Sequence, residues 1–460
     1  MRAAAPARLP NADDAPITRE LARRTAALRY DELPLDIRQW TRHCVLDWLG
    51  VTLAGAREEL SQILAADAAE QGGTPMARLI GRDAIVPTQQ AALVNGAASH
   101  ALDYDDVNMT LGGHPTVAVL PALFALAEAN GASGAALIAA FVAGYETLCR
   151  VGALVAPGHY ARGYHTTATV GGFGAAAACA NLLGLDAAGT ATALGIAGTQ
   201  AAGLKSMFGT MCKPLHAGKA AQNGLLAATL AARGFTSRAD VLECEQGFAS
   251  TQSPDFNADA ALAEPPHGWH VRDTLFKYHA ACYLTHAPIE CARELRGREA
   301  LDTAAIREVV VRIDAGAAKV CHITAPRTGL EAKFSLRLTS AMALAGIDTA
   351  RLDSYSERIA ADPSLIALRD KVSVEFERQW PHTMAEMRVT LEDGRAVEAR
   401  HDSGIPAADL AAQQQRLDAK FMSLAEPVVG RSRAERLVAR VAALDGLGSL
   451  DELTRLCVPA

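Results

Sequence analysis

Apolar residues recur at helical spacing through most of the first 270 residues and again after Pro406. A repeat of apolar positions every three or four residues is typical of helices that bury one face in a core. Glycine, proline, serine or threonine bounds most of these segments, as expected at helix ends. The pattern predicts two helices within 15–56 and further helices at 61–70, 87–99, 116–129, 133–151, 171–184 and 187–204, with a short extended piece at 76–80.

The pattern changes near residue 271, where β-branched residues and alternating polarity appear. Alternation with period two is typical of strands that bury one face. The pair Asp393-Gly394 lies between two such runs and is a strong signal for a hairpin turn. The elements predicted here are strands at 306–313 and 372–376, the two arms of a hairpin within 386–401, and an amphipathic helix at 331–346.

These two patterns together predict a mainly α protein with an α+β insert. The helical domain is discontinuous and consists of residues 1–270 and 406–460, whereas the α+β domain spans 271–405. Half of the residues are apolar and alanine is abundant, so helices can pack closely around a large core. The net charge of −7 argues against a general nucleic-acid binder, which would show a basic face.

The nine cysteines are scattered, and the sequence contains no CxxC pair. An odd number of unclustered cysteines indicates free thiols in a reducing compartment, and the spacing matches no zinc or iron–sulfur site. The first residues lack the apolar run of a signal peptide. The small residues of 171–204 fit a buried helix pair better than a membrane span. We therefore expect a soluble cytoplasmic protein that binds neither membranes nor nucleic acid.

The stretch from His100 to Thr116, HALDYDDVNMTLGGHPT, concentrates polar chemistry between two predicted helices. It contains three aspartates and two histidines, and Pro115 after His114 is typical of a helix start. Histidine exchanges protons near neutral pH, so a histidine held at a helix end is a candidate acid or base. The competing interpretation is an ordinary acidic loop whose histidine caps the helix.

A second polar segment, 204–224, carries three lysines and one histidine and no acidic residue. Spaced lysines are most often a solvated helix face. Here the neighbours include Met, Phe, Cys and Leu, which suit burial, and a lysine among apolar residues normally needs an anionic partner. Together with the loop around His165 and the segment from Lys277 to His286, these polar segments could converge on a substrate that bears several carboxylates.

Several sequence segments resemble the MmgE/PrpD family. The resemblance runs from about residue 15 to the C-terminus and is carried by ALDYDDVN, GHPTVAVLPAL, GYHTTATVGGFGAAAA, KPLHAGKAAQNGLLAA and EAKFSLRL. The family includes 2-methylcitrate dehydratase, cis-aconitate decarboxylase and iminodisuccinate epimerase. The resemblance implies a large all-helical domain built from both chain ends, a smaller α+β lid domain, a homodimer, and no metal or organic cofactor.

The resemblance also implies roles for the residues that match the family's motifs. Four residues match motifs that the resemblance implies to be catalytic. Asp103 opens the D-[FY]-D-D signature, His114 is the histidine of GHP, His165 is that of G-[FY]-H, and Lys213 is the lysine of KPLH. The residues expected to bind substrate are Lys277, which opens the motif of the lid, and also Thr166 and Cys282. A lysine can stabilise an enolate-like intermediate, and a histidine can remove a proton next to a carboxylate. Which histidine is the base stays open.

Some positions depart from the decarboxylase branch of the family. At the positions of Cys282 and Val107, members of that branch are expected to have a histidine and a threonine. They are also expected to have a tyrosine in the region of 315–326, where this chain has none. These differences argue against cis-aconitate decarboxylation. The acidic loop also differs from that of true 2-methylcitrate dehydratases, which carry a tryptophan-containing insertion after their signature, so the substrate stays open. The expected activity is that of a hydro-lyase similar to 2-methylcitrate dehydratase, acting on a small di- or tricarboxylate. The alternatives are an epimerase of an iminodisuccinate-like dicarboxylate and a non-catalytic homologue that binds carboxylates.

Overall fold

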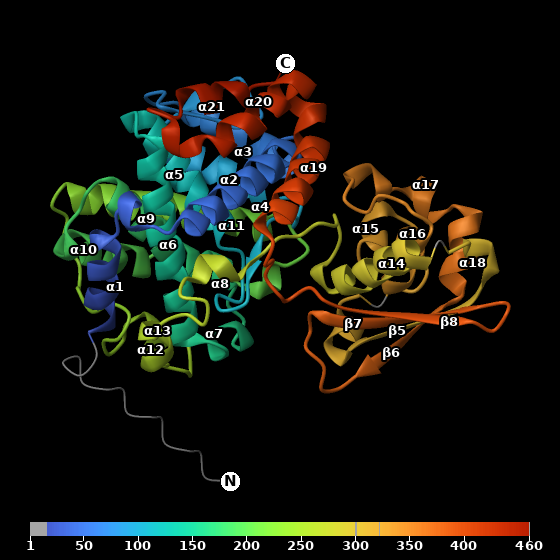
Figure 1. The fold of residues 1–460 in the computed structure, drawn as a ribbon. Helices are drawn as coiled ribbons and strands as arrows, with labels where there is room; N and C mark the ends of the chain where they lie inside the picture. The colour runs from blue at the N-terminus through green and yellow to red at the C-terminus, as the bar shows by residue number, and fades with distance from the viewer. Residues whose placement is uncertain (1–15, 300, 322, 460) are drawn as a thin grey trace, which may run out of the picture. The chain divides into compact units, whose positions relative to one another are not determined.

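The computed structural model describes residues 16–299, 301–321 and 323–459. The contacts within the chain divide it into two units (Figure 1). The helical unit runs to Thr274 and resumes at Leu410, and the α+β unit is Leu275–Asp409. For comparison, the insert proposed from the sequence spans 271–405.

The helical unit is built from helices of very different lengths. In its first part they are α1 (Ile17–Ala27), α2 (Leu35–Gly55), α3 (Glu59–Gln71), α4 (Thr88–His100), α5 (Thr116–Asn130), α6 (Gly134–Val155), α7 (Gly158–Ala161), α8 (Thr166–Thr169), α9 (Gly171–Leu182), α10 (Ala187–Gly198), α11 (Cys212–Ala232), α12 (Phe248–Gln252) and α13 (Ala258–Leu262). The C-terminal segment adds α19 (Leu410–Val429), α20 (Arg431–Ala442) and α21 (Asp451–Leu456). Four two-residue strands accompany them: β1 (Ala77–Arg78), β2 (Ile85–Val86), β3 (Val107–Asn108) and β4 (Thr274–Leu275).

Three largely apolar helices, α5, α6 and α9, are buried on almost all sides and form the centre of the helical unit. A helix without a polar face is stable only when other elements surround it. Helix α6 is long and apolar enough to cross a membrane, but 89% of its apolar 18-residue window is buried inside the protein. It is therefore a core helix of this unit.

Helices α4 and α11 pack with their backbones nearly in contact. A methyl group placed on Gly96 of α4 would lie 2.7 Å from the Cα of Gly218 in α11, so a side chain at Gly96 would force the helices apart. This approach places the C-terminal end of α4, at His100, beside the first turn of α11, which carries Lys213. The small residues thus position two of the polar segments noted in the sequence.

The α+β unit has one four-stranded mixed sheet of order β6-β5-β7-β8. Strand β5 pairs in parallel with β6 and antiparallel with β7, and β7 and β8 form the hairpin predicted around Asp393-Gly394. Helices α14 and α16 pack on the sheet and bury Leu, Ile and Val side chains against it (Figure 1). The strands are β5 (Ile306–Asp314), β6 (Val372–Glu377), β7 (Met384–Leu391) and β8 (Ala396–Asp402), and the helices are α14 (His286–Glu299), α15 (Gly329–Ala332), α16 (Leu336–Leu344), α17 (Glu357–Ala360) and α18 (Pro363–Asp370).

One predicted helix differs from the structure. The segment 331–346, expected to be continuous, belongs to two helices, α15 and α16, that are separated at Lys333-Phe334-Ser335. The Ser335 hydroxyl accepts a hydrogen bond from the Leu338 N–H, 3.2 Å away, and so caps the start of α16. A serine that caps a new helix competes with continuation of the previous one, which apolar spacing does not reveal.

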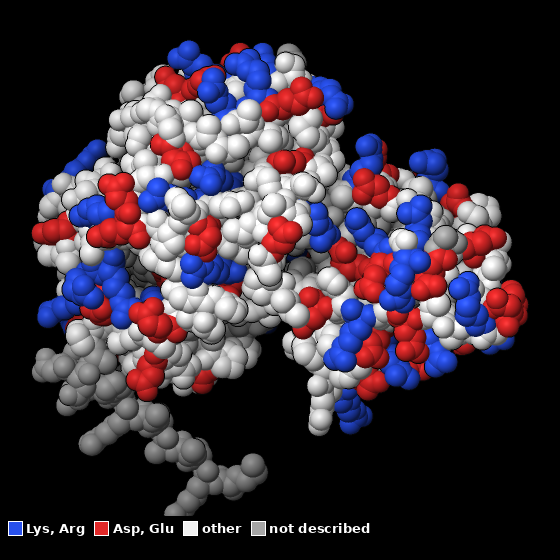
Figure 2. Space-filling view, viewed as in Figure 1, with Lys and Arg blue, Asp and Glu red and all other residues white. Residues whose placement is uncertain are grey.

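The structure confirms a mainly α fold with an α+β part. On the sheet of the α+β unit, charged side chains pair across strands, as in Arg312–Glu375 at 2.9 Å and Arg388–Glu398 at 3.5 Å. Figure 2 shows acidic and basic side chains intermixed over this unit.

Candidate active site

The acidic loop connects the end of α4 to the start of α5 and turns sharply twice. Asp103 has a left-handed backbone conformation with φ of 50°, and Gly112 has φ of 64°. Left-handed backbone is uncommon for residues other than glycine and is enriched at functional sites. His114 lies just before Pro115 and does not cap α5 with its side chain. The interpretation of His114 as a capping residue is therefore wrong.

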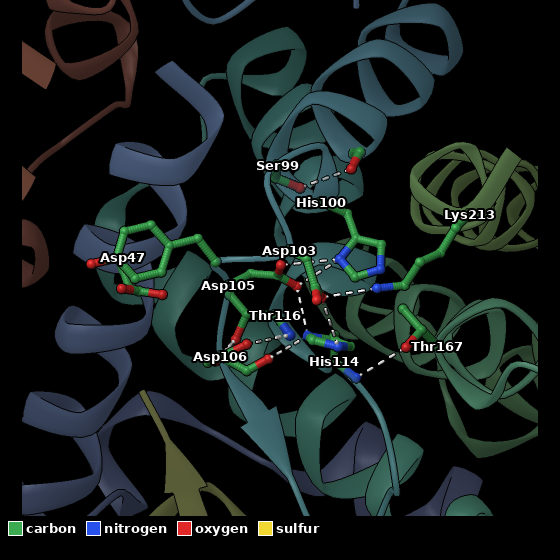
Figure 3. Close-up of polar contacts among 12 residues, drawn as sticks. Asp47, Ser99, His100, Asp103, Asp105, Asp106, His114, Thr116, Thr167 and Lys213 are labelled. Atoms are coloured by element: carbon green, nitrogen blue, oxygen red, sulfur yellow. Dashed lines mark hydrogen bonds and ion pairs between the residues drawn. The ribbon is translucent and has the colours of Figure 1, made fainter. Parts of the chain in front are cut away.

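The carboxylate of Asp105 lies between two histidine rings (Figure 3). The Nδ1 atom of His100 lies 3.0 Å from both carboxylate oxygens, and the Nδ1 atom of His114 lies 2.9 Å from Oδ2. Burial alone would raise the pKa of Asp105, but the two imidazoles that face it hold this pKa well below its usual value. Asp105 is therefore an ionised acceptor that receives an N–H from each ring.

His114 is held in one tautomer by its neighbours. Its Nδ1 faces two acceptors, the Asp105 carboxylate and the Asp106 carbonyl oxygen, each at 2.9 Å. The proton of the neutral ring must therefore be on Nδ1, which leaves a lone pair on Nε2. Nε2 lies 3.6 Å from Oδ1 of Asp103, which is beyond hydrogen-bond distance. His114 thus has the arrangement of a general base.

Lys213, in the first turn of α11, brings a positive charge to the same place. Its ammonium lies 2.9 Å from Oδ1 of Asp103, the oxygen atom that also faces His114. The side chains of Lys213 and Asp103 are 18% and 40% exposed, so their ion pair contributes little to stability and can rearrange around an anion. The cation is thus within reach of a carboxylate bound next to His114 Nε2.

His165, just before α8, is buried next to these groups. Its ring is stacked on His100 with centroids 5.9 Å apart, and His100 in turn lies 4.6 Å from His114. Burial, followed by the nearby charges of His100, His114 and Lys213, moves the pKa of His165 far below its usual value. Burial also lowers the pKa of His100, to about 4. Both rings are therefore neutral at pH 7.

The structure brings together four of the residues singled out in the sequence: Asp103, His114, His165 and Lys213. The hydroxyl of Thr166, expected to contact substrate, donates a hydrogen bond of 2.6 Å to the Gly112 carbonyl and so holds the loop. The remaining two residues belong to the α+β unit. Lys277 is buried there, and Cys282 packs against that unit's core. For these three residues, contact with substrate stays a prediction.

Two further residues, His100 and Asp105, for which the sequence predicted no role, lie at the centre of this group of side chains. Their spacing of five residues across the end of α4 is only weak evidence for such a pairing. A third, Lys420, is buried behind the loop, where its ammonium lies 2.5 Å from Asp47 and 2.7 Å from the Tyr104 carbonyl. Lys420 lies on the apolar face of α19, between Leu417 and Leu424. A lysine at such a position signals a buried ion pair, which sequence alone does not assign to a partner.

Four of these side chains, His100, Asp103, Asp105 and His114, each offer one ligand atom, and these atoms lie within 4.8 Å of one another. The geometry alone would admit a metal ion. However, Asp105 already accepts from both imidazole Nδ1 atoms, and the Lys213 ammonium already balances Asp103. Both carboxylates are therefore already balanced by imidazole N–H groups and an ammonium group, an arrangement that suits proton transfer and fits a metal ion poorly.

The comparisons with known proteins cover most of the chain. The MmgE/PrpD N-terminal domain matches residues 19–261, and the MmgE/PrpD C-terminal domain matches residues 279–445. The chain is 29% identical over 466 residues to cis-aconitate decarboxylase of Homo sapiens, which covers 96% of this chain and 94% of that protein. It is 28% identical over 471 residues to cis-aconitate decarboxylase of Aspergillus terreus, which covers 96% and 95%. The two domain matches show that this chain belongs to the MmgE/PrpD family.

Proposed function

We propose that this protein is a cofactor-independent lyase that removes a proton next to a carboxylate of a small di- or tricarboxylate. The observation that carries the proposal is the arrangement of His114. Asp105 holds its Nδ1–H at 2.9 Å, and its Nε2 atom and the Lys213 ammonium both face Oδ1 of Asp103, at 3.6 and 2.9 Å. A positioned base next to a fixed cation is what the formation of an enolate-like carboxylate requires.

The first step follows from these groups. Nε2 of His114 takes the proton, and the electron pair of the C–H bond moves onto the neighbouring carboxylate, where the Lys213 ammonium stabilises it. The resulting imidazolium lies between two carboxylates, Asp105 at 2.9 Å and Asp103 at 3.6 Å, which favour its charge. His165 is the candidate acid. In a hydro-lyase, its Nε2–H protonates the hydroxyl group that leaves from the adjacent carbon as water.

The named relatives favour a second reaction in the same class. They are cis-aconitate decarboxylases, so a carboxy-lyase reaction is a specific alternative to dehydration. In that reaction a C–C bond breaks, CO₂ leaves, and an acid such as His165 protonates the carbanion. Val107, Cys282 and the absence of tyrosine within 315–326 argue for a different substrate or reaction. We keep the hydro-lyase as the first proposal and the epimerase as a further alternative.

One experiment distinguishes these reactions. The purified protein is incubated in deuterated water with a panel of di- and tricarboxylates, including hydroxy acids and unsaturated acids, and followed by proton NMR. Dehydration produces a vinylic signal without CO₂, decarboxylation releases CO₂, and epimerisation exchanges the C–H for deuterium at unchanged composition. If no compound on a broad panel reacts or exchanges, the proposed enzyme function is wrong, and a carboxylate-binding protein remains. Cytoplasmic location and dimer formation stay predictions.

We expect turnover to survive removal of metal ions. The two carboxylates of the cluster are balanced by imidazole N–H groups and by Lys213, and histidine with lysine supplies base, acid and charge stabilisation. The measurement is the rate after exhaustive dialysis against EDTA, compared with an untreated sample and with samples supplied with Zn²⁺, Mn²⁺ or Mg²⁺. A loss of rate that one of these metals restores would contradict this prediction.

A further inference from the structure

His165 has a partner that the proposed reaction has not used. The Nδ1 atoms of His165 and His216 lie 3.1 Å apart, and the ring centroids are 5.3 Å apart. Two neutral imidazoles can make this contact only if one Nδ1 carries the proton and the other accepts it. The protonation of His165 at Nδ1 is therefore tied to that of His216, and Nε2 of His165 is the atom left to face a ligand.

The backbone holds the two rings in this position. The His165 N–H donates to the carbonyl oxygen of Gly203 at 3.1 Å, and a methyl group placed on Gly203 would lie 3.6 Å from Nδ1 of His216. His216 is in α11, one turn after Lys213, so the helix that supplies the cation also supplies this imidazole. The contact thus connects a loop and a helix that both belong to the proposed site.

The two rings differ in their access to water. His165 is only 3% exposed, whereas His216 is half-buried. The groups that face His165 are His100, His114 and Lys213, besides His216, and they disfavour a positive charge on its ring. An imidazole in such surroundings is not positively charged before the reaction. It therefore has to donate its proton as a neutral ring and to receive a second proton in the same step.

We propose that His216 is a positioning and proton-relay residue that supplies protons from water to the buried His165. The proposal rests on the proposed function, in which His165 protonates the leaving group or the carbanion. Before the step, Nδ1–H of His216 donates to Nδ1 of His165, and this sets the Nε2–H tautomer of His165 that an acid needs.

In the transfer, each ring releases a proton from one nitrogen and takes up a proton at the other. His165 gives its Nε2 proton to the substrate and takes the Nδ1 proton of His216 in the same event. His216 takes a proton from water at its own Nε2, so both rings stay neutral and the hydrogen bond between them reverses direction. The proton that His114 removed passes through water in the emptied site to Nε2 of His165 after product release. The Nδ1 proton of His165 then returns to His216, and His216 gives its Nε2 proton to the hydroxide left in water, which restores both tautomers.

The test uses two variants of the full-length protein. His216→Gln keeps a side chain that can hydrogen-bond to His165 Nδ1 but cannot pass a proton, and His216→Ala leaves space for added imidazole. Loss of a residue that orients a functional histidine costs about 10- to 100-fold at metal sites, and we expect a fall in kcat of that order with little change in KM. Added imidazole should restore part of the rate of His216→Ala. The matched control is His267→Gln, at an exposed histidine paired with Asp273.

A second measurement separates this proposal from the proposed function. In ¹⁵N-labelled protein, NMR reports the tautomer of His165 and the rate at which its ring N–H exchanges with water. We expect slower exchange in His216→Gln than in the unmodified protein, whether or not a substrate has been found. Unchanged exchange in His216→Gln overturns the relay, as does an unchanged kcat in an active enzyme. If exchange slows but the unmodified protein transforms no carboxylate, the relay holds and the proposed lyase function fails.

Discussion

Replacing His114 by glutamine should lower kcat by roughly a hundred- to ten-thousandfold, the usual contribution of a positioned acid or base. The reason is the orientation of the ring. Asp105 and the Asp106 carbonyl hold the Nδ1 proton, each at 2.9 Å, so only Nε2 can take a proton from substrate. Glutamine has a similar size and can keep a hydrogen bond to Asp105, but it cannot accept that proton. The measurement is steady-state turnover together with deuterium exchange at the substrate C–H.

The exchange measurement is the sharper of the two because it isolates the first step. His114→Gln should abolish exchange, whereas His165→Gln, which removes the acid, should reduce turnover and leave exchange detectable. The opposite pattern would reverse the two roles. The same substitution at the exposed His267 serves as the control and should leave both rates unchanged. Melting temperatures should stay near normal in all variants, because none of them opens the apolar core of α5, α6 and α9.

Much of the fold could be predicted from apolar spacing alone. Helix α6 and strand β5 begin and end within a few residues of their predicted bounds, because their buried side chains recur with the period of a helix and of a strand. The break within 331–346 could not be predicted in this way, since Ser335 acts through one hydrogen bond to the backbone. For α11 the sequence predicts a cationic segment at 204–224 without fixing the bounds of a helix, because its polar and apolar positions do not show a clear helical period.

For the site, sequence identified the residues whose types and motifs carry chemistry, but not their pairings. The tautomer of His114 depends on a loop that bends at Asp103, and a bend of that kind has no periodic signal. The contact between His165 and His216 joins residues 51 positions apart, and Lys420 meets a carbonyl 316 positions away. Such long-range contacts depend on how the helices pack, and the close approach of Gly96 and Gly218 is one example that only the folded chain reveals.

Replacing Lys213 by methionine should lower kcat by on the order of a hundred- to a thousandfold, the usual cost of losing one preorganised electrostatic contact. Methionine keeps much of the side chain's bulk and removes the charge. In the unmodified protein, the ammonium lies 2.9 Å from Oδ1 of Asp103, the oxygen atom that also faces Nε2 of His114, where the developing enolate would be formed. Without it, Asp103 is left as an uncompensated carboxylate next to the substrate, which raises the barrier further.

The matched control is Lys219→Met, the same substitution on the same helix. Lys219 is exposed, and its ammonium lies 2.5 Å from the side-chain oxygen of Gln222, its neighbour one turn later on α11. Equal losses in both variants would mean that a lysine on α11 acts through net charge or helix stability. A loss confined to Lys213→Met, with KM for a dicarboxylate raised less than kcat is lowered, assigns the cation to the transition state. A Lys213→Met variant with full rate would leave the family membership intact and remove Lys213 from the mechanism.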